Sequence, residues 1–270
     1  MIMSKVGFLI TARLKSSRLP LKLLAEIDGT EIIRHVIRRA KNIAGIDRVI
    51  LCTSLNPQDF PLIEIAQQED ISYFCGSEVD VLDRLGKAAS MFGLDAFVSM
   101  TGDNPVFCTY HANRVADILR RDKTVDYVHI PGLPNGTAVY GLNTSAVNAA
   151  CELKTELDTE IWGPFINRPD FFSVHSMQAT PGFQITARLT VDNPEDYLFV
   201  LALASHSRKG FSSLTLPDIG RIIQEHPELN DINSGIVQRG LSNELLEKLN
   251  KFFTSNEERI REVITRHRQT

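Results

Sequence analysis

A basic segment directly follows the first apolar run of the chain. The run spans residues 6–11 (VGFLIT), and the next segment carries four cations with two hydroxyl residues between them. They are Arg13, Lys15, Ser16, Ser17, Arg18 and Lys22. Arginine makes paired hydrogen bonds to phosphate oxygens and lysine adds a point charge, so this composition suits a polyphosphate. A solvated basic loop is the alternative, but the position at the end of an apolar strand favours phosphate.

The same segment lacks the glycines of the common phosphate-binding motifs. No G-x-G-x-x-G follows the first apolar run, and no G-x-x-x-x-G-K-[ST] occurs in the sequence. Dinucleotide binding of the Rossmann type and P-loop hydrolysis are therefore weakly supported. We expect side chains, rather than a glycine-rich backbone cradle, to hold the phosphates.

Two aspartates follow two other apolar segments. Asp103 lies in TGDNP directly after residues 96–101, and Asp192 lies in TVDNPED directly after residues 188–191. Each could be only a turn residue or a helix-start residue. Together with the basic segment they form a coherent set, with two carboxylates to hold Mg²⁺ and several cations to neutralise a triphosphate.

The first half of the chain alternates strand patterns with helix patterns. We expect strands at residues 6–11, 48–53, 71–75, 96–101 and 125–130, and helices at residues 31–44, 57–69, 81–92 and 110–121. This order predicts an α/β fold, Rossmann-like, with helices on both faces of a mostly parallel sheet. Ligands of such sheets bind beyond the carboxyl ends of the strands, where the basic segment and Asp103 lie.

The pattern changes after residue 130. We expect helices at residues 144–153 and 158–167, strands at residues 171–179 and 188–191, and a helix that begins with Asn193 and Pro194 and ends near residue 205. Residues 211–270 are mostly helical and end in amphipathic helices at residues 243–253 and 257–267. We therefore divide the chain into an α/β domain, residues 1–210, and a small C-terminal helical extension, residues 211–270.

Composition excludes several classes of function. A net charge of −4 over 270 residues argues against a general nucleic-acid binder. The four cysteines are far apart and lack metal-ligand spacing, and the histidines form no H-E-x-x-H pair, so a zinc enzyme is improbable. No apolar stretch reaches the length of a membrane helix. We expect a cytosolic protein that binds neither nucleic acid nor membrane.

Residues 10–22 resemble the I-x-A-R-x-x-S-x-R-L-P-x-K opening of the CMP-sugar synthetases. This cytidylyltransferase family includes the CMP-Kdo synthetases, the CMP-sialic acid synthetases and the spore-coat polysaccharide (SpsF-type) enzymes. The likeness continues in order along the chain to about residue 235. It includes residues 29–36, 52–57, 76–84, 101–103, 190–196, 226–229 and Asn233.

The resemblance implies a nucleotide-diphospho-sugar transferase-like fold, CTP as substrate, Mg²⁺ as cofactor and a homodimer. Arg13, Lys22 and Asp103 would be catalytic, with Arg13 and Lys22 on the triphosphate, and Asp103 and Asp192 would bind the metal. The implied nucleotide-binding residues are Ala12, Arg13, Ser17, Arg18, Lys22, Ser77, Asp80 and Arg84.

Three departures from the family pattern bear on the site. Leu21 stands where glycine is usual, Asn135 replaces an aspartate common in the spore-coat branch, and Thr159-Glu160-Ile161 stands where that branch often has Arg-Glu-His. The last two lie on the expected acceptor side, so Asn135 and Glu160 are candidate acceptor contacts. The neighbouring Trp162 has helical spacing with Phe165, and we expect both to pack in the core.

These observations predict a cytidylyltransferase that joins CMP to an acidic sugar (Kdo, sialic acid or a related acid) and releases pyrophosphate, for surface polysaccharide biosynthesis. One alternative is a nucleotidyltransferase that uses another NTP or accepts a sugar phosphate or phosphonate. A second alternative is a non-catalytic nucleotide-binding subunit of a polysaccharide assembly. A glycosyltransferase is less well supported, because no D-x-D motif follows residues 96–101.

Overall fold

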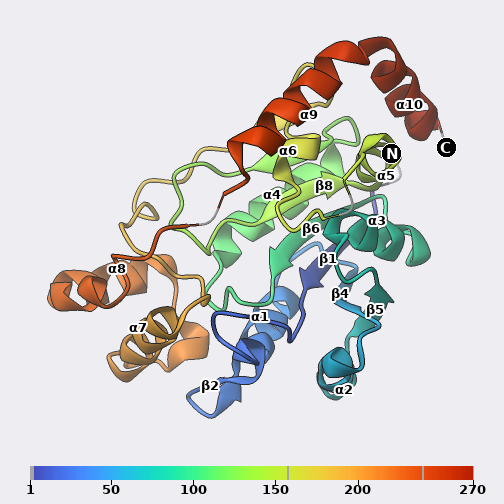
Figure 1. Ribbon diagram of the computed structural model, residues 1–270. Coiled ribbons are helices and arrows are strands. Elements are labelled where there is room, and N and C mark those ends of the chain that lie inside the picture. The colour runs from blue at the N-terminus through green and yellow to red at the C-terminus, as the bar shows by residue number, and fades with distance from the viewer. Residues whose placement is uncertain (1–2, 157, 239, 270) are drawn as a thin grey trace.

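A seven-stranded sheet forms the centre of the computed structural model, which describes residues 3–156, 158–238 and 240–269 (Figure 1). In spatial order its strands are β5 (Ser72–Gly76), β4 (Arg48–Ser54), β1 (Val6–Thr11), β6 (Ala96–Thr101), β8 (Tyr140–Asn143), β7 (Tyr127–His129) and β9 (Val174–Ser176). The first four are parallel, whereas β8 runs antiparallel to both of its neighbours. A separate hairpin joins β2 (Glu26–Ile27) to β3 (Thr30–Glu31).

Helices cover both faces of the sheet, as the sequence predicts. One face is covered by α1 (Ile32–Lys41), α2 (Phe60–Gln68), α4 (Thr109–Arg121), α7 (Pro194–Ser205) and α8 (Leu216–Glu225). The other is covered by α3 (Val81–Met91), α5 (Thr144–Leu153), α6 (Gly163–Ile166), α9 (Asn243–Ser255) and α10 (Glu257–Gln269). Strand β1 is buried throughout, and because alternate side chains of a strand point to opposite faces, Phe8 joins the first hydrophobic cluster and Leu9 the second.

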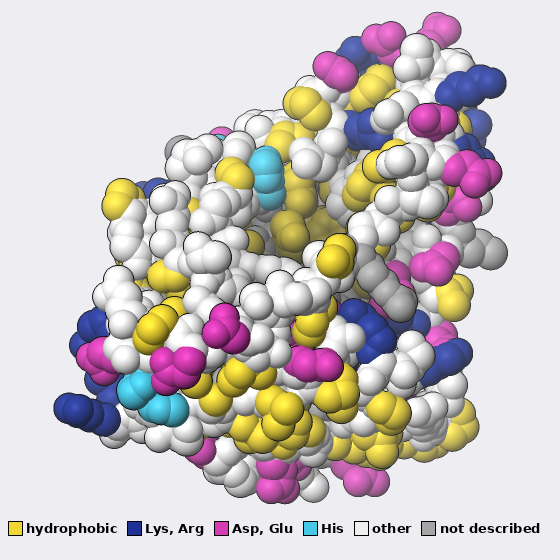
Figure 2. Space-filling model, turned by 60° about the vertical axis from the view of Figure 1, so that its left-hand side comes forward, with side chains coloured by type: hydrophobic (Ala, Val, Ile, Leu, Met, Phe, Trp, Pro, Cys, Tyr) yellow, Lys and Arg dark blue, Asp and Glu magenta, His cyan; other side chains and the backbone are white. Residues whose placement is uncertain are grey.

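The last two helices lie at one end of the molecule (Figure 1). Helix α10 packs on α5, and α9 contacts α6, so both extend the second hydrophobic cluster. In the space-filling view this end carries charged side chains of both signs, and the surface beside it is hollowed with hydrophobic side chains on the floor (Figure 2). Among the described residues, no helix combines the length and apolar character that a membrane span requires.

The structure corrects the sequence interpretation in the region after residue 130. Residues 188–191 do not form a strand and make only an isolated bridge, between Asn135 and Arg188. The helix expected at residues 158–167 is reduced to α6, because Pro164 has no N–H to continue a helix that starts earlier. Strand β8 was not predicted, because its four residues run directly into α5. The helix starting at Pro194 is confirmed.

Candidate active site

A pocket of about 350 Å³ opens beyond the carboxyl ends of β1 and β6. Strand pairing aligns Thr11 with Thr101, so the segments that follow these strands begin side by side. Eight of the predicted residues line the pocket: Ala12, Arg13, Ser17, Arg18, Lys22, Arg84, Asp103 and Asp192. Lys15, Ser16, Glu160 and Trp162 also line it. The volume is within the range of small-ligand sites.

The basic segment is anchored by a buried aspartate. The backbone N–H of Leu14 donates a hydrogen bond to Asp59 Oδ1 (2.7 Å), and the Ser54 hydroxyl donates to Asp59 Oδ2 (2.5 Å). Leu14 is itself buried, so the chain is fixed between Arg13 and Lys15. Both of those side chains line the pocket. Arg13 and Lys15 therefore flank a backbone position that is anchored to the core.

Leu21 adopts a left-handed backbone conformation immediately before Lys22. Its φ is 55° and its ψ is 23°, a region that residues other than glycine rarely occupy. This is the position at which the family pattern has glycine. The turn directs the chain into the short 3-10 helix Lys22–Leu24, so the strained residue sets the direction from which Lys22 enters the pocket.

We expect the Leu21→Gly variant to be more stable than Leu21→Ala, by about 1 kcal/mol. The left-handed conformation costs a residue with a Cβ atom roughly 1–2 kcal/mol, and the greater freedom of glycine in the unfolded chain offsets only part of this. Urea unfolding of the two variants measures the difference, and the Cβ atom is the only group that distinguishes them. Equal stabilities, or a more stable alanine variant, would show that the left-handed conformation at residue 21 is not strained.

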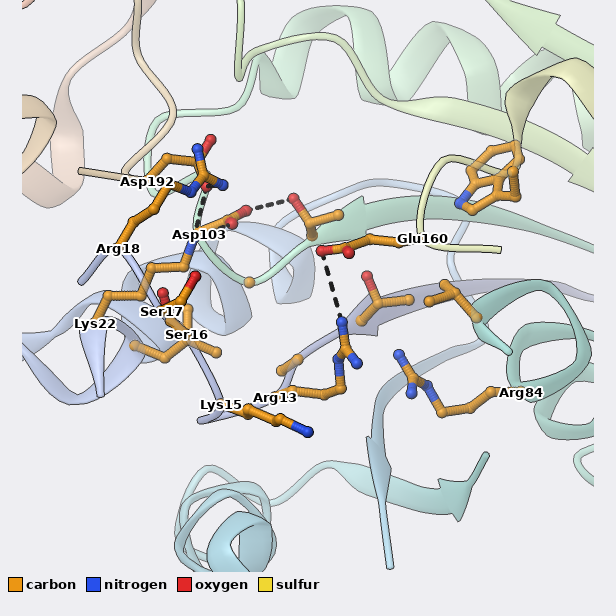
Figure 3. A pocket seen from close by; sticks show the side chains of 17 residues that line it. Arg13, Lys15, Ser16, Ser17, Arg18, Lys22, Arg84, Asp103, Glu160 and Asp192 are labelled. Atoms are coloured by element: carbon orange, nitrogen blue, oxygen red, sulfur yellow. Dashed lines mark hydrogen bonds and ion pairs between the residues drawn. The ribbon is translucent and has the colours of Figure 1, made fainter. Parts of the chain in front are cut away.

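Lys22 bridges the two predicted metal-binding carboxylates. Its Nζ atom lies 2.6 Å from Asp103 Oδ2 and 2.8 Å from Asp192 Oδ1. Arg18 Nη2 also donates to Asp192 Oδ1, at 2.9 Å. Figure 3 shows these four side chains converging at one end of the pocket. Residues separated by up to 174 positions in the chain thus form one charge cluster.

Burial and charge act in opposite directions on this cluster. Burial lowers the pKa of the Lys22 ammonium, but the two aspartates outweigh burial and the pKa lies above its ordinary value. Burial raises the pKa of the Asp192 carboxyl, but Lys22, Arg18 and Arg188 outweigh it and bring that pKa below its ordinary value. Lys22 and Asp192 are therefore both charged at neutral pH.

Backbone contacts bring Asp192 to the end of β6. The N–H of Val191 donates to the carbonyl oxygen of Asp103 (2.9 Å), and the N–H of Leu189 donates to that of Asn135 (2.9 Å). Gly136 makes this approach possible, because a Cβ atom there would lie only 2.3 Å from the Thr190 nitrogen. The short extended segment before Asp192 therefore lies against the Asn135–Gly136 turn and is not part of the main sheet.

A second pair of cations lies at the other end of the pocket. Arg13 Nη1 donates to the carbonyl oxygen of Glu78 (2.7 Å), and Arg84 Nη1 donates to that of Ser77 (2.6 Å). Burial lowers the pKa of Arg84, and the nearby Arg13 guanidinium lowers it further. The buried Nε atom of Arg84 has no hydrogen-bond partner in the structure. Two adjacent guanidinium groups in a pocket suit an anionic ligand.

Ser77 and Asp80 do not line the pocket. The Ser77 hydroxyl accepts a hydrogen bond from the Asp80 N–H (3.0 Å). The buried Asp80 carboxylate caps α3, accepts a hydrogen bond from the Thr159 hydroxyl (2.8 Å) and pairs with Lys154. In this structure Asp80 therefore holds the chain at Thr159, next to the pocket residue Glu160, and its contact with a nucleotide stays a prediction.

Of the two candidate acceptor residues, only Glu160 lines the pocket. Its side chain is 72% exposed and its carboxylate lies 3.6 Å from Arg13 Nη2, whereas the Asn135 side chain donates to Gln238 Oε1 (2.7 Å). Trp162 packs edge-on against Tyr140, as its predicted core position requires, but it also lines the pocket. The sequence interpretation missed that second role, because helical spacing with Phe165 gives no sign of a cavity nearby.

The donor set at Asp103 and Asp192 fits a divalent cation. Both residues offer carboxylate oxygens to one cationic atom, and carboxylates are preferred ligands of Mg²⁺. Among the described residues, no three His, Cys, Asp or Glu side chains are grouped so that they could hold a metal ion. A pair of carboxylates agrees with the usual Mg²⁺ site of nucleotide enzymes, where substrate phosphates and water complete the coordination.

Comparisons with known proteins show the family and the fold of this chain. The family model described as cytidylyltransferase matches residues 8–199. The spore coat polysaccharide biosynthesis protein SpsF of Bacillus subtilis is 26% identical over 212 residues, which are 74% of this chain and 87% of SpsF. The family match, residues 8–199, includes the basic segment and both aspartates.

Two solved structures share the fold. A cytidylyltransferase from Leptospira borgpetersenii superposes with a TM-score of 0.78 at 23% identity, covering 87% of this chain and all of that one. A CMP:2-keto-3-deoxy-manno-octonic acid synthetase complexed with CTP gives a TM-score of 0.61 at 17% identity, covering 75% of this chain and 99% of the other. At these identities the likeness establishes the fold.

Proposed function

This chain belongs to the cytidylyltransferase family, and from this premise we propose that it transfers the cytidylyl group of CTP to a hydroxyl of an acidic sugar. The chain is a nucleotidyltransferase, so a non-catalytic role loses its support. The observation that carries the proposal is the cluster of Lys22, Asp103 and Asp192 at the end of a pocket lined with arginines.

The proposed reaction exchanges one P–O bond for another. The acceptor oxygen attacks the α-phosphorus of CTP, the bond from that phosphorus to the β-phosphate breaks, and pyrophosphate and the hydroxyl proton are released. Such transfers depend on positioning and charge neutralisation more than on covalent catalysis. The pocket supplies cations at both ends for this purpose.

Each charged group has a proposed task in this reaction. Arg13 binds the triphosphate, Lys22 neutralises the pyrophosphate as it leaves, and Arg18 assists. Asp103 and Asp192 would hold Mg²⁺, which would lower the pKa of the acceptor hydroxyl and polarise the α-phosphate. Among the described residues, no histidine lines the pocket to act as a general base.

The proposed acceptor is an acidic sugar such as Kdo, a sialic acid or a related acid, used in surface polysaccharide biosynthesis. Support comes from the names of the similar proteins, SpsF and the octonic acid synthetase. Within the pocket, Glu160 and Trp162 lie outside the phosphate-binding segment and are the proposed acceptor contacts. Mg²⁺, a homodimer, a cytoplasmic location and the division at residue 210 remain parts of the proposal.

We expect pyrophosphate release with Mg²⁺ to require CTP and an acidic sugar. The test combines each of the four NTPs with a panel of acidic sugars and sugar phosphates and measures pyrophosphate in a coupled assay. The Asp103→Asn variant is the negative control. Preference for UTP or GTP, or for a sugar phosphate, would support the alternative nucleotidyl transfer. Failure of every nucleotide to bind with Mg²⁺ in calorimetry would contradict the proposal.

A further inference from the structure

A buried ion network lies directly behind Asp192. Arg188 Nη2 donates to Asp192 Oδ2 (3.0 Å), and Arg188 Nε donates to Asp196 Oδ1 (2.9 Å). All three side chains are buried, and Asp196 is fully so. The two oxygens of Asp192 therefore face different partners. Oδ2 is held by Arg188 behind the pocket, and Oδ1 faces Lys22 and Arg18 within it.

Residues from beyond the matched family segment complete the network. The side-chain NH₂ of Asn233 donates to Asp196 Oδ1 and to the carbonyl oxygen of Arg188, both at 3.0 Å. Gln238 accepts a hydrogen bond from the Arg188 guanidinium. The family match ends at residue 199, so both contacts come from the proposed C-terminal extension.

Several hydrogen bonds hold the Asp196 carboxylate in place. Its Oδ2 atom accepts hydrogen bonds from the N–H groups of Asp192 and Asn193, both at 3.0 Å. The Asp196 carboxylate is thus bound directly to the backbone of Asp192. A buried carboxylate that loses one of its donors is strongly disfavoured, which opposes rotation of Arg188 away from it. Asp192 is therefore held in one orientation by groups that do not enter the pocket.

We propose that Arg188 and Asn233 are positioning residues, which fix Asp192 so that only Oδ1 is presented to a divalent cation. This inference rests on the proposed function, since it assumes that Asp192 holds the metal. The C-terminal extension would thereby contribute to metal binding through the buried side-chain amide of Asn233. Groups around a metal-binding carboxylate orient it, and their loss commonly weakens metal binding by about 10–100-fold.

The test measures Mn²⁺ binding in the presence of saturating CTP without acceptor, so that no turnover occurs. Asn233→Ala is compared with Asn230→Ala, because Asn230 also donates from its side chain to a backbone carbonyl, that of Thr186 (3.2 Å), and does not contact Asp196. We expect Asn233→Ala to weaken Mn²⁺ binding by about tenfold and Asn230→Ala to leave it unchanged. Circular dichroism melting confirms that each variant is folded.

A second variant, Arg188→Lys, keeps the buried charge but cannot contact Asp192 and Asp196 with separate nitrogens, and we expect it to weaken Mn²⁺ binding likewise. CTP binding without metal distinguishes positioning from general damage, and we expect the variants to retain it. Equal Mn²⁺ affinity in Asn233→Ala and Asn230→Ala, or parallel loss of metal-free CTP binding, would overturn this inference alone. A wild-type protein that does not bind CTP would overturn the proposed function with it.

Discussion

Replacing Asp103 with asparagine will slow pyrophosphate release from CTP by about 10²-fold or more. Asp103 contributes one of the two carboxylates that converge on Lys22, and its Oδ1 atom also accepts a hydrogen bond from the Thr101 hydroxyl (2.5 Å). Asparagine keeps the shape and can still accept the Thr101 hydrogen bond at its oxygen, but it loses the acceptor for Lys22 and the charge that would hold a divalent cation. Losses of this size are typical when one preorganised electrostatic group is removed from an active site.

The matched control is Asp117→Asn. Asp117 lies on the exposed surface of α4, pairs with Arg121 one turn later and is outside the pocket. We expect this variant to keep the wild-type rate, because exposed ion pairs of this kind contribute little. Steady-state rates at saturating CTP and varied Mg²⁺ measure both variants. If Asp103→Asn turned over at close to the wild-type rate, Asp103 could not be the metal-binding carboxylate.

Lys22→Met will reduce turnover by a similar factor, about 10²-fold or more, yet will strengthen the binding of Mn²⁺ to the protein without nucleotide. In the structure, the Lys22 ammonium lies between the two carboxylates that would hold the metal, at 2.6 and 2.8 Å. Lys22 must leave them before they can bind a divalent cation. At an effective dielectric constant near 20, such contacts are worth roughly several kcal/mol, so we expect the gain in Mn²⁺ affinity to be about tenfold or more.

Lys15→Met removes the same charge from the same pocket and serves as its control. Lys15 pairs with Glu78 (3.0 Å) and touches neither Asp103 nor Asp192, so we expect Mn²⁺ affinity without nucleotide to stay near the wild-type value. Electron paramagnetic resonance of free Mn²⁺ compares the three proteins directly. Unchanged Mn²⁺ affinity in Lys22→Met would show that Lys22 and the metal do not compete for these carboxylates.

Asp192 lies between two cations of the pocket and one cation behind it. Asp192 contacts three cations: Lys22 and Arg18 at Oδ1, and Arg188 at Oδ2. Arg188 is tied to Asp196, whereas Lys22 and Arg18 belong to the segment that lines the pocket. Under the proposed function, Lys22 and Arg18 would turn towards the triphosphate, whereas Arg188, paired with Asp196, would continue to hold the carboxylate.

Sequence patterns and the family resemblance were enough to predict the α/β architecture and eight of the residues that line the pocket. Continuous apolar runs such as residues 6–11 identify buried parallel strands, since such strands are covered on both faces. Because the carboxyl ends of parallel strands meet at one edge of the sheet, the basic segment and Asp103 could be placed together before any coordinates were known. The placement of the basic segment and Asp103 depends only on local pattern and on the geometry of parallel sheets, whereas Ala12 and Arg84 were implied by the family resemblance.

How the charges pair, and which residues support them, becomes visible only in the folded chain. No local pattern shows that Lys22 bridges Asp103 and Asp192, that Asp80 supports the segment before Glu160, or that Trp162 reaches the pocket. The contacts of Arg188 with Asn233 and Gln238 span 45 and 50 positions. Such contacts depend on how distant segments pack against one another. Packing involves the whole chain, whereas sequence periodicity describes only residues that are close along the chain.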